Sequence, residues 1–256
     1  MNKTRLFAAI IVVVFAGAVY FYATSNPRIS FVNTNTILDK KVPPKTRENN
    51  NKEQIALTFD DGPYGTSTAQ ILSILEQKHV PATFFVMGKN VERFPEEVQR
   101  MVRDGHLVGN HSYNHEKNLA ELSREKFKAN LDMTEEIITR TAGTRPVLFR
   151  PPYGLMSETM KHVLEEAGYT LVLWNVDPRD WDYASSTASE IVQRVEKAAK
   201  PNAIILLHDG RDTHVNYPRD NTVAALPKII DGLENKGYTF VTVDKIISSS
   251  TASKFK

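Results

Sequence analysis

Short apolar runs alternate with amphipathic stretches along residues 55–247 of the chain. The runs are too short for helices, and most of them are bounded by glycine, proline or charged residues. They cover residues 55–59, 82–86, 106–108, 147–149, 171–176, 203–207 and 239–243. Apolar runs without strict polar alternation are typical of strands that are buried on both faces of a parallel sheet. The pattern therefore predicts about seven parallel strands.

The stretches between the runs carry apolar residues at helical spacing. In residues 68–78, for example, the apolar residues on one side are Ile71, Leu72, Ile74 and Leu75. The other predicted helices cover residues 123–139, 157–167, 189–199 and 223–235. Alternating strands and helices predict an α/β fold, a distorted (β/α) barrel that is closed or nearly closed. An open doubly wound sheet competes with it, but acids and a proline follow the first run in place of a glycine-rich phosphate loop.

The N-terminal residues differ from the rest of the chain. Residues 6–22 are apolar and uncharged and follow Lys3 and Arg5. At about 1.5 Å per residue they are just long enough to span a bilayer, and the positive flank predicts an N-terminus inside the cell. We expect residues 1–22 to be a signal anchor, a single transmembrane helix in the cell membrane that leaves the rest of the chain extracellular. Cleavage to a secreted protein is the alternative.

The remaining boundaries follow from composition. Residues 23–53 are rich in Asn, Thr, Pro and Lys and are predicted to be a linker, residues 54–247 a folded domain, and residues 248–256 a disordered tail. The 32 basic and 30 acidic residues nearly balance, which gives no electrostatic argument for nucleic-acid binding. Because the chain has no cysteine, any metal must take nitrogen and oxygen ligands. We expect a monomer.

Two clusters of ionisable residues suggest a site. Asp60 and Asp61 directly follow the run 55–59, and adjacent carboxylates repel each other unless each has its own partner. His111 and His115 stand four residues apart, so that in a helix they would share one face and could converge on a metal. Active sites of parallel barrels assemble at the carboxyl ends of the strands, and we expect both clusters there.

Three further clusters stand at or near predicted strand ends. Arg150 precedes two prolines, which lack an N–H, so that Tyr153 supplies the next backbone donor. Residues 177–181 place carboxylates beside Trp181, and the run 203–207 ends at His208. Each cluster alone also fits an ordinary turn, a charged loop or a capped strand. Together with the acids and the histidine pair they predict one site.

In this order the five clusters resemble the motifs of the polysaccharide deacetylases of carbohydrate esterase family 4, the NodB-homology domain. The resemblance covers residues 55–247, and the first three motifs are specific when they occur together. The motifs read Thr58-Phe59-Asp60-Asp61-Gly62-Pro63, His111-Ser112-Tyr113-Asn114-His115, Arg150-Pro151-Pro152-Tyr153-Gly154, Asp177-Pro178-Arg179-Asp180-Trp181 and Leu206-Leu207-His208. The resemblance implies a distorted (β/α) barrel that removes N-acetyl groups from sugars with one divalent metal.

The resemblance also implies roles for individual residues. The metal ligands would be Asp61, His111 and His115. Zinc is the expected ion, and cobalt or another divalent ion also suits one carboxylate and two imidazoles. Asp60 would be the general base, oriented by Arg150. The backbone N–H of Tyr153 would donate to the oxyanion.

The last two motifs would serve the leaving group and the acetyl group. His208 would protonate the departing sugar amine. Asp180 is expected to set the tautomer of His208, with Asp177 as the second candidate. Trp181 and Leu206 would wall the acetyl pocket.

The expected substrate follows from location. An exported domain on a linker favours an acetylated cell-wall glycan, most simply the N-acetylglucosamine of peptidoglycan. A chitooligosaccharide, an exopolysaccharide or an O-acetylated xylan would use the same machinery. A glycoside hydrolase is a rival, although its two carboxylates flank the bond at roughly 5 to 10 Å. A carbohydrate-binding protein without activity is a rival from another class.

Overall fold

The computed structural model describes residues 11–15, 18–22, 53–210 and 219–252, and the chain divides into two compact units, Met1–Asn50 and Asn51–Lys256. In the first unit, β1 (Ile11–Phe15) pairs with β2 (Ala18–Tyr22) in antiparallel register. The two strands stand in place of the expected transmembrane helix, and their β-branched and aromatic residues favour extended backbone. No helix within the described ranges is both long and apolar enough to cross a membrane. Of the predicted linker, only Glu53 lies inside these ranges.

A seven-stranded parallel sheet forms the second unit, which confirms the number and direction of the predicted strands. The strand order is β7-β6-β5-β4-β3-β8, and β9 also pairs with β3. The strands are β3 (Gln54–Asp60), β4 (Thr83–Val86), β5 (Leu107–Asn110), β6 (Leu148–Phe149), β7 (Thr170–Leu171), β8 (Ala203–His208) and β9 (Thr239–Phe240).

The sheet curls into a half-barrel, and one segment contacts both of its sides. β7 pairs with β6, and a few residues later Val176 forms a parallel bridge to Ile205 of β8. The N–H of Leu206 donates to the Val176 carbonyl at 2.9 Å. The sequence predicts one strand over residues 171–176, whereas the regular strand ends at Leu171 because the segment changes partner there.

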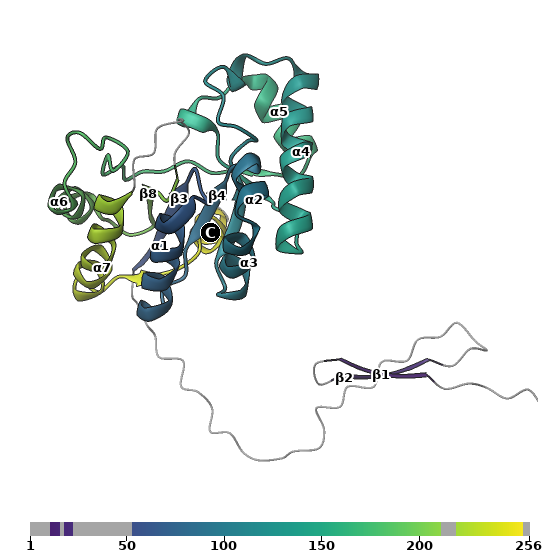
Figure 1. The fold of residues 1–256 in the computed structure, drawn as a ribbon, viewed down its shortest axis with the longest axis horizontal. Helices are drawn as coiled ribbons and strands as arrows, with labels where there is room; N and C mark the ends of the chain where they lie inside the picture. Colours follow the sequence, from purple (N-terminus) through teal and green to yellow (C-terminus); the bar gives the residue numbers. More distant parts are fainter. Residues whose placement is uncertain (1–10, 16–17, 23–52, 211–218, 253–256) are drawn as a thin grey trace, which may run out of the picture. The chain divides into compact units, whose positions relative to one another are not determined.

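Helices cover the outside of the sheet, except for α8, which packs against the opposite face with Ala56 and Phe85. Figure 1 shows α1, α2, α3 and α7 beside β3, β4 and β8. The helices are α1 (Gly65–Lys78), α2 (Gly88–Arg93), α3 (Pro95–Arg103), α4 (Arg124–Ala142), α5 (Glu158–Glu166), α6 (Ala188–Ala198), α7 (Asp220–Asn235) and α8 (Val243–Ala252), with 3₁₀ turns η1 (Leu119–Glu121) and η2 (Pro152–Gly154). α8 continues to Ala252 where a disordered tail is predicted, and the Ser248 hydroxyl donates to the Asp244 carbonyl one turn back. Residues 253–256 lie outside the described ranges.

Alternation along β3 separates the core from the site. Ile55, Leu57 and Phe59 are fully buried in the main core beneath the helices, and each such side chain contributes about 1.5–3 kcal/mol by burial. The residues between them belong to the opposite face of the strand. Ala56 packs there with Val243 and other apolar residues, further along Thr58 bonds to a buried arginine, and Asp60 ends the strand. The curled sheet is therefore apolar next to α8 and polar at its carboxyl end.

Candidate active site

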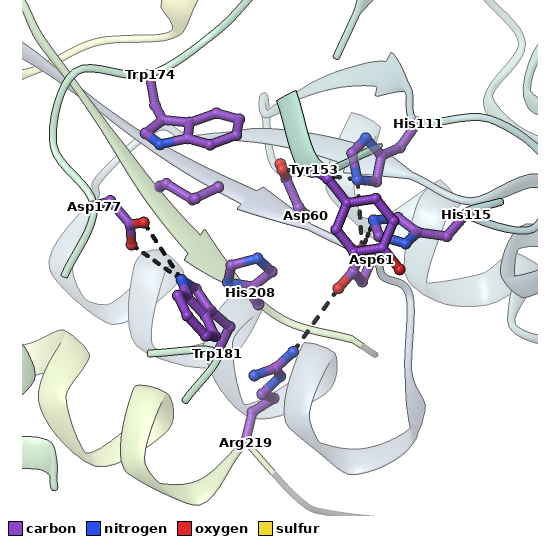
Figure 2. A pocket seen from close by; sticks show the side chains of 11 residues that line it. Asp60, Asp61, His111, His115, Tyr153, Trp174, Asp177, Trp181, His208 and Arg219 are labelled. Carbon is purple, nitrogen blue, oxygen red and sulfur yellow. Dashed lines mark hydrogen bonds and ion pairs between the residues drawn. The ribbon is translucent and has the colours of Figure 1, made fainter. Parts of the chain in front are cut away.

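A cavity of about 490 Å³ opens at the carboxyl ends of the strands (Figure 2). Its lining residues are Asp60, Asp61, His111, His115, Tyr153, Trp174, Asp177, Trp181, Leu206, His208 and Arg219. Eight of the ten site residues expected from the sequence line it, and the other two, Arg150 and Asp180, are buried in contact with lining residues. The structure thus gathers all five sequence clusters around one pocket.

The two adjacent carboxylates face different arginines. Asp60 ends β3, and Arg150 Nη1 donates to its Oδ1 at 2.8 Å. Asp61 follows with a backbone φ of 73°, outside the strand conformation, and its Oδ2 lies 3.8 Å from Arg219 Nη2. Both acids are nearly inaccessible, with 3% and 5% of their surface exposed. Separate partners let two buried acids stand side by side, as the sequence requires.

Arg150 is held rigidly inside the curled sheet. It is fully buried, and its guanidinium carbon lies 4.1 Å from the centre of the Phe85 ring. It also donates to Thr58 Oγ1 at 2.8 Å and to the Val172 and Leu173 carbonyls at 3.4 and 3.3 Å. A buried arginine with this many acceptors has one orientation, and it fixes Asp60 in turn.

The histidine pair converges through a loop and not through a helix. Residues 111–115 follow β5 in irregular backbone, and Ser112 and His115 have φ values of 68° and 58°. The two imidazoles therefore do not converge as neighbours on one face of a helix. The loop nevertheless brings His111 Nε2 to 3.4 Å and His115 Nε2 to 3.3 Å from Asp61 Oδ1.

These three residues fit a divalent metal. His111 Nδ1 lies 2.7 Å from the Arg150 carbonyl, which can only accept, so Nδ1 carries the proton and Nε2 presents a lone pair. Asp61 Oδ1 is buried without a hydrogen-bond partner among the described residues. Ligand atoms of Asp61, His111 and His115 all lie within 4.8 Å of one another. Lone pairs that converge in this way repel unless a cation lies between them, and one carboxylate with two imidazoles is a typical zinc-type donor set.

Electrostatics in the pocket also favour positive charge at this point. Burial alone would raise the pKa of Asp61, but the adjacent His111 side chain and the charges of His115 and His208 outweigh it and lower that pKa. Burial alone would lower the pKa of His111, but Asp60 and Asp61 outweigh it and raise that pKa. The carboxylates thus attract a cation or a proton to the same place.

His208 and Asp180 form a hydrogen-bonded pair on another side of the pocket (Figure 2 shows His208). His208 Nδ1 lies 2.7 Å from Asp180 Oδ1, while Asp180 Oδ2 accepts from the His208 backbone N–H and from Thr222 Oγ1, both at 2.8 Å. Burial would lower the pKa of His208, but the charge and hydrogen bond of Asp180 raise it. The pair therefore favours an imidazolium whose Nε2 remains for a ligand.

The two acids of the fourth motif have separate tasks. Asp177 accepts from Trp181 Nε1 at 3.3 Å and from the Arg179 backbone N–H at 2.8 Å. It holds the indole, while Asp180 is the carboxylate bonded to His208. Trp181 is 44% exposed and Leu206 is buried, and both line the cavity.

Left-handed backbone concentrates in the loops around the pocket. Asp61, Ser112, His115, Tyr153 and Arg179 are five of the seven described non-glycine residues with positive φ. Each such residue costs on the order of 1–3 kcal/mol, and such residues cluster at functional sites where surrounding contacts hold them. Tyr153, at 57°, also packs its ring against that of His115 in an edge-to-face arrangement, with ring centres 4.5 Å apart. The left-handed residues therefore lie in the loops that bring His115 and Tyr153 into contact.

Two lining residues escape sequence reasoning. Trp174 lies within a run interpreted as a strand, where an aromatic residue needs no further explanation. Arg219 is only 6% exposed and stands immediately before α7, outside all five motifs. Neither residue carries a local signal, because its place in the pocket depends on contacts with distant segments.

Comparisons with known proteins agree with this geometry. The sequence model of the family described as polysaccharide deacetylase matches residues 47–172. The chain is 40% identical over 204 residues to a peptidoglycan-N-acetylglucosamine deacetylase of Bacillus cereus, covering 80% of this chain and 72% of that protein. It is 38% identical over 196 residues to the peptidoglycan-N-acetylmuramic acid deacetylase PdaC of Bacillus subtilis, covering 77% of this chain and 39% of that protein.

A solved structure extends the likeness to three dimensions. The structure of the peptidoglycan deacetylase PdaC from Bacillus subtilis matches with a TM-score of 0.70 and 36% identity, covering 80% of this chain and 95% of that one. Sequence identity, coverage and fold agree over the unit that holds the pocket. The chain belongs to the polysaccharide deacetylase family.

Proposed function

We propose that this protein is a metal-dependent hydrolase that removes N-acetyl groups from N-acetylglucosamine units of peptidoglycan. The observation that carries the proposal is one pocket with the Asp61, His111 and His115 donor set beside Asp60 and across from His208. The names of the relatives support a cell-wall glycan, and they differ in the sugar that is deacetylated. A chitooligosaccharide, an exopolysaccharide or an O-acetylated glycan is the alternative substrate.

Asp61, His111 and His115 would hold the metal, and we propose zinc. The nitrogen and oxygen donors favour it, although cobalt suits the same set. When bound, the ion would polarise the acetyl carbonyl and lower the pKa of water. Arg150 and the loop after β5 keep the ligand side chains and the base in fixed relative positions.

Asp60 is the group that takes the proton of the attacking water. Its Oδ1 is occupied by Arg150, so Oδ2 is the atom that accepts. The water oxygen adds to the acetyl carbon, and the backbone N–H of Tyr153 donates to the oxygen that becomes negative. His208 then gives its Nε2 proton to the sugar nitrogen as the C–N bond breaks. The products are acetate and a free amine.

A glycoside hydrolase fits the pocket less well. Both adjacent carboxylates approach the same atom, His111 Nε2, at 3.8 and 3.4 Å. Two acids on one side of a pocket cannot flank a glycosidic bond from opposite faces. The site also has a base, a paired acid and a metal-type donor set, which a protein that only binds carbohydrate does not require.

We also propose that residues 1–22 anchor the protein in the cell membrane with its catalytic unit outside, as a monomer. The uncharged run behind two basic residues supports this. Mass spectrometry of the protein from the producing cell tests it, since an intact N-terminus in the membrane fraction is expected. A product that begins after residue 22 in the medium would show secretion by cleavage.

Acetate release tests the proposed reaction. Purified protein would be given peptidoglycan and N-acetylglucosamine oligomers, with and without a chelator and added zinc. Chelator-sensitive acetate release without chain shortening is expected, with peptidoglycan the better substrate. Shortened chains would identify a hydrolase of glycosidic bonds, and no product from either polymer by the zinc-loaded protein would refute the proposed activity.

A further inference from the structure

Arg219 is a buried cation in the pocket that none of the steps above uses. Its side chain is held at two further points, because Nε donates to the Gly210 carbonyl at 2.7 Å and Nη1 to the Asp180 carbonyl at 3.4 Å. Gly210 follows the segment that ends in His208, and Asp180 is the partner of that histidine. Two backbone carbonyls, one close to His208 in sequence and the other that of Asp180 itself, therefore hold the guanidinium in place.

The third contact of Arg219 is with a metal-type ligand. Nη2 lies 3.8 Å from Asp61 Oδ2, as the dashed line in Figure 2 shows, while Oδ1 of the same carboxylate faces the two histidines. At 3.8 Å the contact is an ion pair and not a hydrogen bond. Because Arg219 holds Oδ2, the Asp61 carboxylate can offer only Oδ1 to the two histidines and to a metal between them.

We propose that Arg219 is a positioning residue that determines which oxygen of Asp61 is presented to the histidine pair. The inference rests on the proposed metal-dependent function. Arg150 and Arg219 then divide the adjacent acids, with Arg150 orienting Asp60 and Arg219 orienting Asp61. Arg219 also links Asp61 to the two segments that carry His208 and Asp180.

Two effects of Arg219 on metal affinity have opposite signs. Orientation of a ligand by an outer partner strengthens binding, and losing such a partner typically weakens affinity 10–100-fold. A nearby positive charge repels a dication, so its removal by itself would tighten binding. The proposal requires that orientation outweighs repulsion, and two substitutions separate these effects.

The test measures zinc affinity of the full chain by competition with a chromogenic chelator. Arg219→Met removes charge and anchoring and is expected to weaken zinc binding about 10–100-fold. Arg219→Lys keeps the charge that repels the dication but loses the planar fork, so it is expected to weaken zinc binding at least as much as Arg219→Met. Circular dichroism and the melting temperature identify a misfolded variant, and if the Met variant fails to fold the Lys variant decides. A role confined to stability would lower the melting temperature and leave zinc affinity unchanged.

Arg194→Met is the matched control. Like Arg219, Arg194 holds the loop that carries Asp180. It donates to the Pro178 carbonyl at 3.0 Å and to Ser186 Oγ at 2.7 Å, away from Asp61. We expect its zinc affinity to equal that of the parent. The inference is overturned if a folded Arg219→Met or Arg219→Lys binds zinc as tightly as the parent or more tightly, or if Arg194→Met weakens binding equally.

Failure of the proposed function gives a different result. A parent that binds zinc but releases no acetate would refute the activity, while the affinities of the variants would still test Arg219. A parent that binds no zinc would overturn the metal site and the role of Arg219 together.

Discussion

Replacing Asp180 with asparagine tests the general-acid step of the proposed mechanism. The Asp180 side chain is fully buried and accepts three hydrogen bonds, one at Oδ1 from His208 Nδ1 and two at Oδ2 from the His208 N–H and Thr222. An asparagine of the same size has one acceptor oxygen. If that oxygen keeps the two donors at Oδ2, its NH₂ faces His208 Nδ1 and forces the imidazole proton onto Nε2.

The substitution removes the negative charge of Asp180, which stabilises the protonated form of the buried His208. Burial lowers the pKa of His208 and Asp180 raises it, so in Asp180→Asn the pKa of His208 falls. A general acid contributes about 10²–10⁴-fold to the rate, which corresponds to about 3–5 kcal/mol in the activation free energy. We expect kcat to fall by that factor at pH 7, with zinc affinity within about twofold of the parent's, because the altered side chain is none of the donors to the metal.

The pH dependence of activity shows the direction in which the substitution moves the pKa of His208. The acid acts when protonated, so activity declines as pH rises through the pKa of His208, and this alkaline limb should move to lower pH in the variant. The assay is acetate release from N-acetylglucosamine oligomers between pH 5 and 9. Asp182→Asn, in the same loop but bonded to Arg179 and Ser185, is the control and should leave the limb in place. The role of the His208–Asp180 pair would be refuted if kcat of Asp180→Asn stayed within about threefold of the parent's and the alkaline limb of its pH profile did not move.

Three other substitutions test the base, the metal ligands and a structural histidine. Asp60→Asn keeps an acceptor for Arg150 and should bind zinc normally while losing about 10²–10⁴-fold in kcat; near-parental turnover would remove Asp60 from the base role. His111→Ala removes a donor and should lose zinc in a competition titration, so unchanged affinity would contradict the site. His106 is buried, its Nδ1 accepts from the Ala82 N–H, and burial lowers its pKa. The stability that it contributes is therefore complete above pH 6.5 and declines as pH falls below that value. Urea unfolding of the parent and of His106→Asn should show a difference that narrows below pH 6.5, by at most about 1.4 kcal/mol per pH unit; a difference that widens on acidification would reverse the argument.

The strands were predictable because their signal is local. Each of the seven apolar runs overlaps one strand of the sheet, since burial on both faces requires continuous apolar residues. The parallel arrangement then follows from the alternation with helices, and it places the clusters that follow the strands at one edge. Asp60 and His208, for example, are directly paired residues of β3 and β8.

Loop geometry was not predictable in the same way. The spacing of His111 and His115 puts both on one face only if the segment is helical, yet the two imidazoles meet in a loop in which Ser112 and His115 adopt left-handed backbone. A spacing of four residues is compatible with a helix and with such a loop, and contacts with the surrounding segments decide between the two structures. The N-terminal strands likewise replace an expected helix in a segment whose apolar residues fit either structure.

By itself the sequence determined the parallel α/β architecture, the order of the clusters and the residue types that could serve as metal ligands, a base and an acid. Only the tertiary structure decided which carboxylate bonds to His208 and that Arg219 faces Asp61. It also showed that residues 170–176 contact both β6 and β8. Burial and periodicity act over neighbouring residues and leave a pattern along the chain. Partner choice depends on distances between segments far apart in sequence, and such distances leave no local pattern.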